Sequence, residues 1–291
     1  MQSYYKSPDR AFTLLHGDCI ELLSKFEFKF DMIFADPPYF LSNGGISVHA
    51  GKMVSVNKGD WDCSRGLDKD CEFNHYWLSA CRDKLKDGGT IWVCGTHHNI
   101  FAIAHELNML GFKILNCITW VKQNPPPNLS CRYFTHSTEF ILWARKGKKT
   151  PHKFNYDLMK QSNGGKQMKD VWVLPSIAQW EKNCGKHPTQ KPLPLVARSI
   201  LSCTNPQDWV LDPFCGSGTT GIAANLFGRR FLGVDSGREY LDLSVCRKEE
   251  LCDHNKRELY KNKICEKLNI PNDNKVGVLR DCEELYYELP F

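Results

Sequence analysis

Residues 209–221 read WVLDPFCGSGTTG, and this stretch decides the fold class. An apolar segment, Trp209 to Leu211, leads into an acidic residue and a glycine-rich turn, and helix-forming residues follow. Glycines in such a turn let a ligand approach the backbone at the start of a helix, where free N–H groups point outward. The stretch therefore predicts a strand, a ligand-binding loop and a helix of an α/β fold.

The glycine pattern also narrows the kind of ligand. The Gly-Lys-Ser/Thr of a nucleotide-triphosphate loop does not follow, and the full G-x-G-x-x-G of dinucleotide enzymes is missing. The next apolar segment, 231–234, ends at Asp235, whose carboxylate could bind the paired hydroxyls of a ribose. A cofactor with a nucleoside but no pyrophosphate fits this combination.

Strand-like and helix-like segments alternate along the chain, which is the pattern of parallel strands with crossover helices. We expect an α/β fold with seven strands in one twisted, mostly parallel sheet and helices on both faces. The expected strands are Phe12–Leu15, Met32–Ala35, Thr90–Cys94, Ile114–Trp120, Glu139–Ala144, Trp209–Leu211 and Phe231–Val234. The expected helices are Phe73–Leu85, Ile100–Leu110, Leu193–Cys203, Thr219–Phe227 and Arg238–Leu251.

The length of 291 residues favours one main domain with insertions. We expect a single catalytic domain at 1–251, a flexible insertion at about 40–72, a basic and turn-rich insertion at about 122–183, and a charged extension at 252–291. No stretch of about 18 apolar residues occurs, and the N-terminus lacks the features of a signal peptide. A cytoplasmic protein without membrane association is therefore expected.

Cysteine spacing and net charge narrow the possible classes of protein further. Fourteen cysteines are scattered without one CxxC pair, which favours free thiols in a reducing compartment and predicts no metal site. The net charge is +5, but residues 145–191 carry eleven Lys or Arg against three acids. Such a segment suits a polyanion, although lysine-rich surface is common for other reasons.

A second motif, Asp36-Pro37-Pro38-Tyr39, directly follows the expected strand that ends at Ala35. Open α/β sheets bind ligands at this end of a strand, and the two prolines stiffen the backbone. Asp36 and the Pro37 carbonyl could each accept one N–H of an exocyclic amino group, which would aim the nitrogen lone pair at an electrophile. Tyr39 could stack on the base. The alternative is a stiff turn in which Tyr39 merely packs.

Together these motifs resemble the amino-methyltransferases of DNA. The order, with DPPY first and the glycine loop about 175 residues later, is similar to their circularly permuted beta class. His16-Gly17-Asp18-Cys19 resembles the GDC segment of this class, and residues 187–192 resemble its HPTQKP stretch. The resemblance spans residues 14–251. The segments FADPPYFLSNGGIS, NLSCRYFTHSTE and GKQMKDVW look like the second adenine methylase of Dpn-type restriction systems.

The resemblance implies a Rossmann-like, S-adenosylmethionine-dependent fold that methylates adenine N6 in GATC, in double-stranded and also single-stranded DNA. It implies that Asp18 and Phe214 lie near the cofactor adenine, Asp36 near its amino group, and Lys191 with Thr189 at its carboxylate. The expected cofactor-binding residues are Asp18, Cys19, Asp36, His187, Thr189, Lys191, Asp212, Phe214, Gly216, Gly218, Thr219, Thr220 and Asp235. The expected catalytic residues are Asp36, Pro37, Pro38 and Tyr39. Cys19 could equally serve as a small apolar residue in the core, and His187 as a residue that caps a helix or turn.

DNA recognition is expected in the insertion at 122–183, where this class reads its target. Arg can bind guanine through two hydrogen bonds, and Lys can contact phosphates. The candidates are Arg132, Tyr133, Lys160, Lys166, Lys169 and Trp172. Which residue reads which base is left open, and any single lysine could belong to a solvated surface. A homodimer and a cognate restriction endonuclease are further expected partners.

Other functions predict other residues. N4-cytosine methylation needs the same lone-pair chemistry, but cytosine enzymes of this kind usually carry Ser where Asp36 stands. Cytosine-C5 methylation needs a Pro-Cys nucleophile loop, and the chain has no such dipeptide. Methylation of RNA or of protein glutamine stays open, as does a catalytically silent DNA-binding module, although intact motifs disfavour the last.

Overall fold

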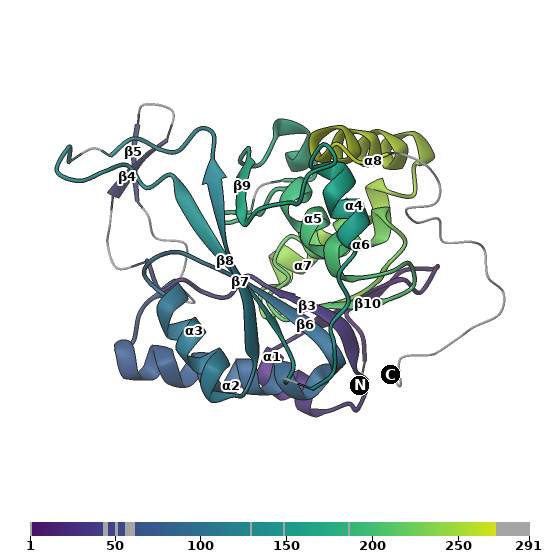
Figure 1. The fold of residues 1–291 in the computed structure, drawn as a ribbon, viewed down its shortest axis with the longest axis horizontal. Helices are drawn as coiled ribbons and strands as arrows, with labels where there is room; N and C mark the ends of the chain where they lie inside the picture. Colours follow the sequence, from purple (N-terminus) through teal and green to yellow (C-terminus); the bar gives the residue numbers. More distant parts are fainter. Residues whose placement is uncertain are drawn as a thin grey trace.

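The computed structural model describes residues 2–42, 46–49, 52–55, 62–128, 130–147, 149–185 and 187–271. Its strands are β1 (Tyr5–Lys6), β2 (Phe12–His16), β3 (Phe30–Ala35), β4 (Ile46–His49), β5 (Lys52–Ser55), β6 (Leu85–Gly95), β7 (Lys113–Lys122), β8 (Thr138–Arg145), β9 (Val171–Leu174), β10 (Trp209–Asp212) and β11 (Arg230–Asp235). Nine of them form one sheet, in the order β1-β2-β11-β10-β3-β6-β8-β7-β9 (Figure 1). β4 and β5 form a separate hairpin.

All seven expected strands are present, but the predicted number was wrong because the sheet gains β1 and β9. β1 pairs antiparallel with β2, and β9 pairs parallel with β7. β1 has only two residues, and β9 only four in a polar segment, so neither gives a periodic signal. The centre of the sheet is parallel from β2 through β11, β10 and β3 to β6, as expected, and β8 runs antiparallel to both its neighbours.

Helices cover both faces of the sheet (Figure 1). They are α1 (Cys19–Ser24), α2 (Leu67–Lys84), α3 (Ile100–Met109), α4 (Tyr156–Ser162), α5 (Leu193–Cys203), α6 (Thr219–Leu226), α7 (Arg238–Glu250) and α8 (His254–Leu268). Buried side chains of α1 to α3 share one hydrophobic core with the sheet, and those of α4 to α8 share the other. The five expected helices are confirmed, and α2 begins six residues earlier than predicted.

The segments expected to lie outside this core behave differently from one another. In the insertion predicted at 40–72, residues 43–45, 50, 51 and 56–61 lie outside the described residues, as do residues 272–291 of the extension. α8, by contrast, buries Tyr260, Ile264 and Leu268 in the core beside α5. The first half of the predicted extension is therefore part of the packed fold.

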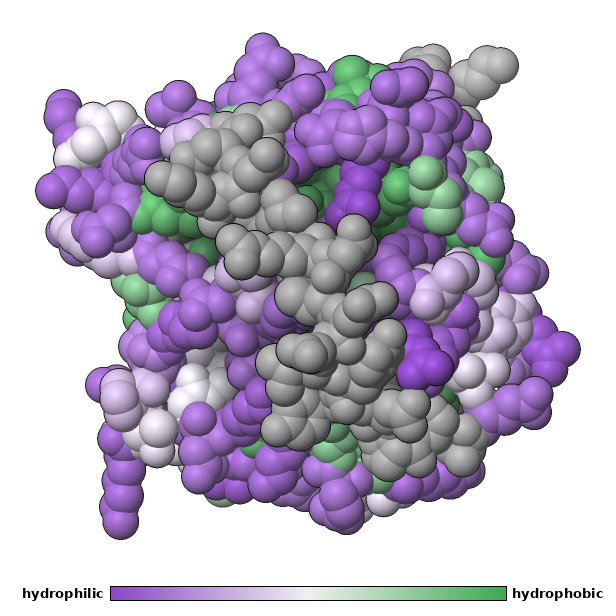
Figure 2. Space-filling model, turned by 90° about the vertical axis from the view of Figure 1, so that its right-hand side faces the viewer, coloured by the Kyte–Doolittle hydropathy of each residue, from purple (hydrophilic) through white to green (hydrophobic). Residues whose placement is uncertain are grey.

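Within the described ranges, no helix combines the length and the apolar character needed to cross a bilayer. Figure 2 shows one face of the molecule, which is mostly hydrophilic with small, scattered hydrophobic areas.

Close packing of α6 on the sheet depends on one glycine. A Cβ atom at Gly221 would lie 2.4 Å from ring atoms of both Phe12 and Phe231. Those two rings already contact each other, with centroids 4.9 Å apart. Because both phenylalanines are fully buried, neither ring can move aside without opening a gap elsewhere.

We therefore predict that Gly221→Ala lowers the free energy of unfolding by about 1–3 kcal/mol, the usual cost of overpacking a filled core. Urea unfolding followed by circular dichroism measures it. Adding Phe231→Leu should recover part of the loss in Gly221→Ala, because the smaller side chain leaves room for the methyl group. Unchanged stability in the single variant would show that α6 does not press on the two rings.

Candidate active site

The expected motifs meet at the carboxyl edge of the parallel strands. β2, β11, β10 and β3 are neighbours and run in the same direction, so the loops that follow them emerge side by side. These loops carry Asp18, Asp235, the glycine loop at 212–221 and Asp36. They surround one cavity of about 690 Å³.

Every expected catalytic residue and every expected cofactor residue except Gly218 lines this cavity. Gly218 has a φ angle of +73°, and a Cβ there would lie 2.0 Å from the hydroxyl oxygen of Ser244 and 3.4 Å from its Cα. This glycine is therefore needed where the loop packs on α7. Its neighbour Gly216 does line the cavity, beside His187.

Two carboxylates, the buried Asp212 and the half-buried Asp235, fix the shape of the glycine loop. Asp235 accepts hydrogen bonds from the backbone N–H groups of Gly216 at 2.7 Å and Gly237 at 2.9 Å. Asp212 accepts from the Thr220 hydroxyl at 2.5 Å and from the Phe214 N–H at 3.0 Å. Burial raises the pKa of Asp212 to about 7 and raises that of Asp235. A ligand that offers further hydrogen-bond donors or positive charge would stabilise both carboxylates.

The centre of the site is a buried ion pair. The Lys191 ammonium lies 2.7 Å and 2.6 Å from the two oxygens of Asp36, and the Tyr39 hydroxyl donates to Asp36 at 2.7 Å. Burial alone would lower the pKa of Lys191, but the carboxylates of Asp36 and Glu139 outweigh it, and the pKa is raised. Burial raises the pKa of Tyr39 well above its usual value, with Asp36 adding to the effect. Lys191 is thus a cation and Tyr39 a neutral donor.

Glu139 is a site residue that the sequence did not reveal. Its carboxylate lies 3.9 Å from Lys191 and 2.5 Å from Lys122, so charges of opposite sign alternate from the end of β7 to Asp36. The sequence marked Glu139 only as the start of a strand. An acid leading into the apolar run FILWA was the one available signal.

Asp62 is a second site residue that the sequence did not reveal, and it supports the DPPY loop by accepting backbone hydrogen bonds. Its side chain, 1% exposed, accepts from the backbone N–H groups of Tyr39 at 2.8 Å and Phe40 at 2.9 Å and from the Ser42 hydroxyl at 2.9 Å. Phe40 has a φ angle of +57°, which costs free energy for a residue with a Cβ. The hydrogen bonds of Asp62 stabilise this conformation directly after the catalytic motif.

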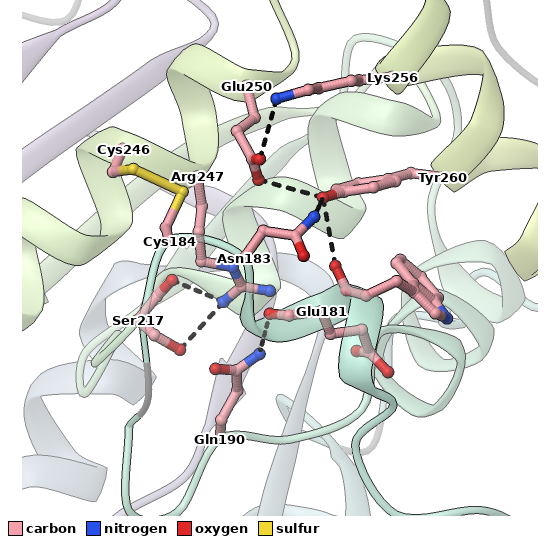
Figure 3. Close-up of a disulfide and its surroundings, with 11 residues drawn as sticks. Glu181, Asn183, Cys184, Gln190, Ser217, Cys246, Arg247, Glu250, Lys256 and Tyr260 are labelled. Atoms are coloured by element: carbon pink, nitrogen blue, oxygen red, sulfur yellow. Dashed lines mark hydrogen bonds and ion pairs between the residues drawn. A yellow bond between two sulfur atoms is a disulfide. The ribbon is translucent and has the colours of Figure 1, made fainter.

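The loop before His187 is joined to α7, which corrects the expectation that all cysteines are free. Cys184 and Cys246 form a disulfide, with Cα atoms 6.0 Å apart and a sequence separation of 62 (Figure 3). One residue further on, Arg247 donates to the Ser217 carbonyl at 2.7 Å and to its hydroxyl at 3.0 Å. α7 therefore holds both the HPTQKP loop and the glycine loop.

The expected DNA-contacting residues lie outside the cavity. Five of them are exposed, namely Arg132, Tyr133, Lys160, Lys166 and Lys169. Trp172 is not: its side chain is 5% exposed and packs against Trp92, with ring centroids 6.0 Å apart. The expected contact of Trp172 with DNA stays a prediction, because the indole packs in the core but also lines a hollow beside Lys166 and Lys169.

Comparison with known proteins identifies the family of the chain. The sequence model of the DNA methylase family matches residues 30–245. The chain is 53% identical over 265 residues to the type II methyltransferase M2.MboI of Moraxella bovis, covering 91% of this chain and 97% of that one. It is 56% identical over 238 residues to M2.DpnII of Streptococcus pneumoniae, covering 81% and 89%.

Solved structures show the same fold. The M1.HpyAVI–SAM complex superposes with a TM-score of 0.63 at 31% identity, covering 81% of this chain and 98% of that one. The cytosine-N4-specific PvuII DNA methyltransferase superposes with a TM-score of 0.66 at 20% identity, covering 91% and 92%. The expected methyltransferase fold is thus confirmed, apart from the strand number. The chain belongs to the DNA methylase family, and the expected activity, a methyltransferase acting on DNA, is confirmed.

Proposed function

We propose that this enzyme transfers a methyl group from S-adenosylmethionine to the N6 amino group of adenine in the sequence GATC. The observation that carries the proposal is the Asp36 carboxylate at the cavity wall, held by Lys191 and Tyr39 beside the glycine loop. An oriented acceptor at that place is what an exocyclic amino group needs to become a nucleophile.

The residues around the cavity fit the cofactor. Phe214 lines the cavity and packs against the buried Trp77, at a centroid distance of 5.2 Å, and its aromatic ring suits the cofactor adenine. Asp235 supplies carboxylate oxygens for ribose hydroxyls, and Lys191 with Thr189 supplies donors for the methionine carboxylate. When bound, the cofactor supplies an electrophilic methyl group on a sulfonium.

The chain's own groups act on the target base. Asp36 accepts one N–H of the amino group and the Pro37 carbonyl accepts the other, which draws the nitrogen toward tetrahedral geometry. Lys191 donates to both oxygens of Asp36 and so holds the carboxylate in place. Tyr39 lines the same cavity, with its hydroxyl fixed by Asp36, and presents its ring to the base.

Adenine is favoured over N4 of cytosine for two reasons. Asp36 stands where cytosine enzymes of this kind usually carry Ser. The sequence also resembles the second adenine methylase of Dpn-type restriction systems, and the relatives M2.MboI and M2.DpnII are more than half identical to this chain. We assign target recognition to the insertion at 122–183 of a catalytic domain that spans 1–251. Single-stranded DNA, a second copy of the chain and a cognate restriction endonuclease are proposed partners, and the cytoplasm is the proposed compartment.

The first test is Asp36→Ala. We expect the rate of methyl transfer to fall by about a thousandfold, because the amino group loses its acceptor, while the fold remains but is less stable, because Lys191 loses its partner. Transfer of labelled methyl groups to a GATC duplex measures the rate, and circular dichroism checks the fold. Asp87→Ala is the matched control, since that carboxylate belongs to a side chain that is 84% exposed and remote from the cavity. Activity within a fewfold of wild type would refute the assigned role of Asp36.

The second test concerns specificity. Matched oligonucleotides containing GATC or GTAC, each as duplex and as single strand, are incubated with labelled cofactor, digested, and analysed for methylated nucleosides. We expect N6-methyladenine from GATC in both forms, because a single strand has no partner base to unpair. Equal labelling of GTAC would contradict the proposed site, and N4-methylcytosine would contradict the proposed base. Labelling of duplex alone would remove single-stranded DNA from the substrates.

A further inference from the structure

Arg198 on α5 is a half-buried cation that lies over a tryptophan ring. Its guanidinium carbon lies 5.1 Å from the ring centre of Trp172, and its Nε is buried without a hydrogen-bond partner. Burial lowers the pKa of Arg198 to about 10, and no charged group contributes to the shift. Within the described ranges of the chain, no carboxylate pairs with it. The side chain is therefore partly dehydrated but not neutralised.

Arg229 and Arg247, which are more deeply buried than Arg198, donate to acceptors within the protein. Arg229 donates to the Thr204 carbonyl at 2.7 Å and to its hydroxyl at 3.0 Å. Arg247 donates to Ser217, as described above. Removing a charge from water without giving it partners costs free energy, so a cation left in that state indicates a binding site for an anion.

The surroundings of Arg198 suit an anion. It lines a hollow of about 480 Å³ together with Lys166, Lys169 and the amide side chains of Asn163 and Gln167. None of the residues that line this hollow is acidic. Both lysines are exposed at its rim, where they can approach a ligand that lies at the surface.

α5 fixes the hollow relative to the active site. The helix begins at Leu193, two residues after Lys191, and Arg198 follows five residues later, about 7.5 Å along the helix axis. The helix is almost entirely buried, so it forms a rigid link between the two places. A ligand in the hollow would therefore be held at a set distance from Asp36.

We propose that Arg198, with Lys166 and Lys169, binds a phosphodiester group of the DNA backbone. The inference rests on the proposed function, in that the anion is DNA. Arginine suits this role because its planar guanidinium can donate two parallel hydrogen bonds to phosphate oxygens. The contact holds the strand beside the active site without reading its sequence.

The test is Arg198→Met, whose unbranched side chain can still pack on Trp172. For a GATC oligonucleotide we expect the KM for DNA to rise about tenfold, which is the loss of one charge-assisted hydrogen-bonded contact. The slope of log affinity against log salt should decrease in magnitude by about one, because one phosphate contact is gone. The kcat at saturating DNA and the affinity for S-adenosylmethionine should not change.

Arg230→Met is the matched control. Its guanidinium also lies over a tryptophan, 5.7 Å from the ring centre of Trp209, but at the amino ends of the interior strands β10 and β11. We expect wild-type KM and salt slope from it. A second variant, Lys166→Met with Lys169→Met, removes only exposed side chains and should also flatten the salt slope, even if Arg198→Met folds poorly.

The outcomes separate this inference from the proposed function. If the wild-type enzyme methylates GATC but Arg198→Met and the double lysine variant keep its KM and salt slope, the phosphate site is wrong and the function stands. A wild-type enzyme that does not methylate DNA adenine overturns the proposed function instead. Equal losses in Arg230→Met and Arg198→Met would also overturn the site, because the effect would then come from lost packing.

Discussion

The active site depends on the ion pair between Asp36 and Lys191, which are 155 residues apart in sequence and meet at 2.6 Å. Both side chains are largely buried, and removing one partner of such a pair typically costs about 3–5 kcal/mol. β3 carries Asp36 to this place, and the loop before α5 carries Lys191. The pair therefore requires that the two halves of the chain pack correctly, so its geometry is a direct consequence of the sheet order.

The cofactor loops, in turn, depend on α7. A serine of this helix fills the space that a side chain at Gly218 would need, and Arg247 donates to the carbonyl of Ser217. The disulfide between Cys184 and Cys246 attaches the HPTQKP segment to the same helix (Figure 3). Two loops that are distant in sequence are thus fixed to one rigid element, which holds the cavity at a defined width.

Much of this site could be predicted from the sequence because parallel strands place their carboxyl ends at one edge, so motifs at strand ends converge. That reasoning brought Asp36 and Asp235 together, and the family resemblance added Asp18 to the same cavity. It could not find Asp62 or Glu139, since a single acid without a repeating pattern gives no sign of its partners. It could not show that Trp172 packs against the core, because a single tryptophan in a basic, turn-rich segment gives no sign of its packing partners.

The distribution of charge explains why the base and the phosphate of a nucleotide must be held in different places. Among Asp, Glu, Lys and Arg, the active-site cavity is lined by the acids Asp18, Asp36, Asp62, Asp70, Glu72, Asp212, Asp235 and Glu239 and by the bases Arg65, Lys69 and Lys191. A phosphate would be repelled there, whereas a neutral base can enter and a sulfonium cation is attracted. A flipped adenine must therefore leave its backbone outside the cavity, where a basic, acid-free surface such as that around Arg198 can hold it. An acidic cavity beside a basic hollow selects the base for chemistry and the phosphate for anchoring.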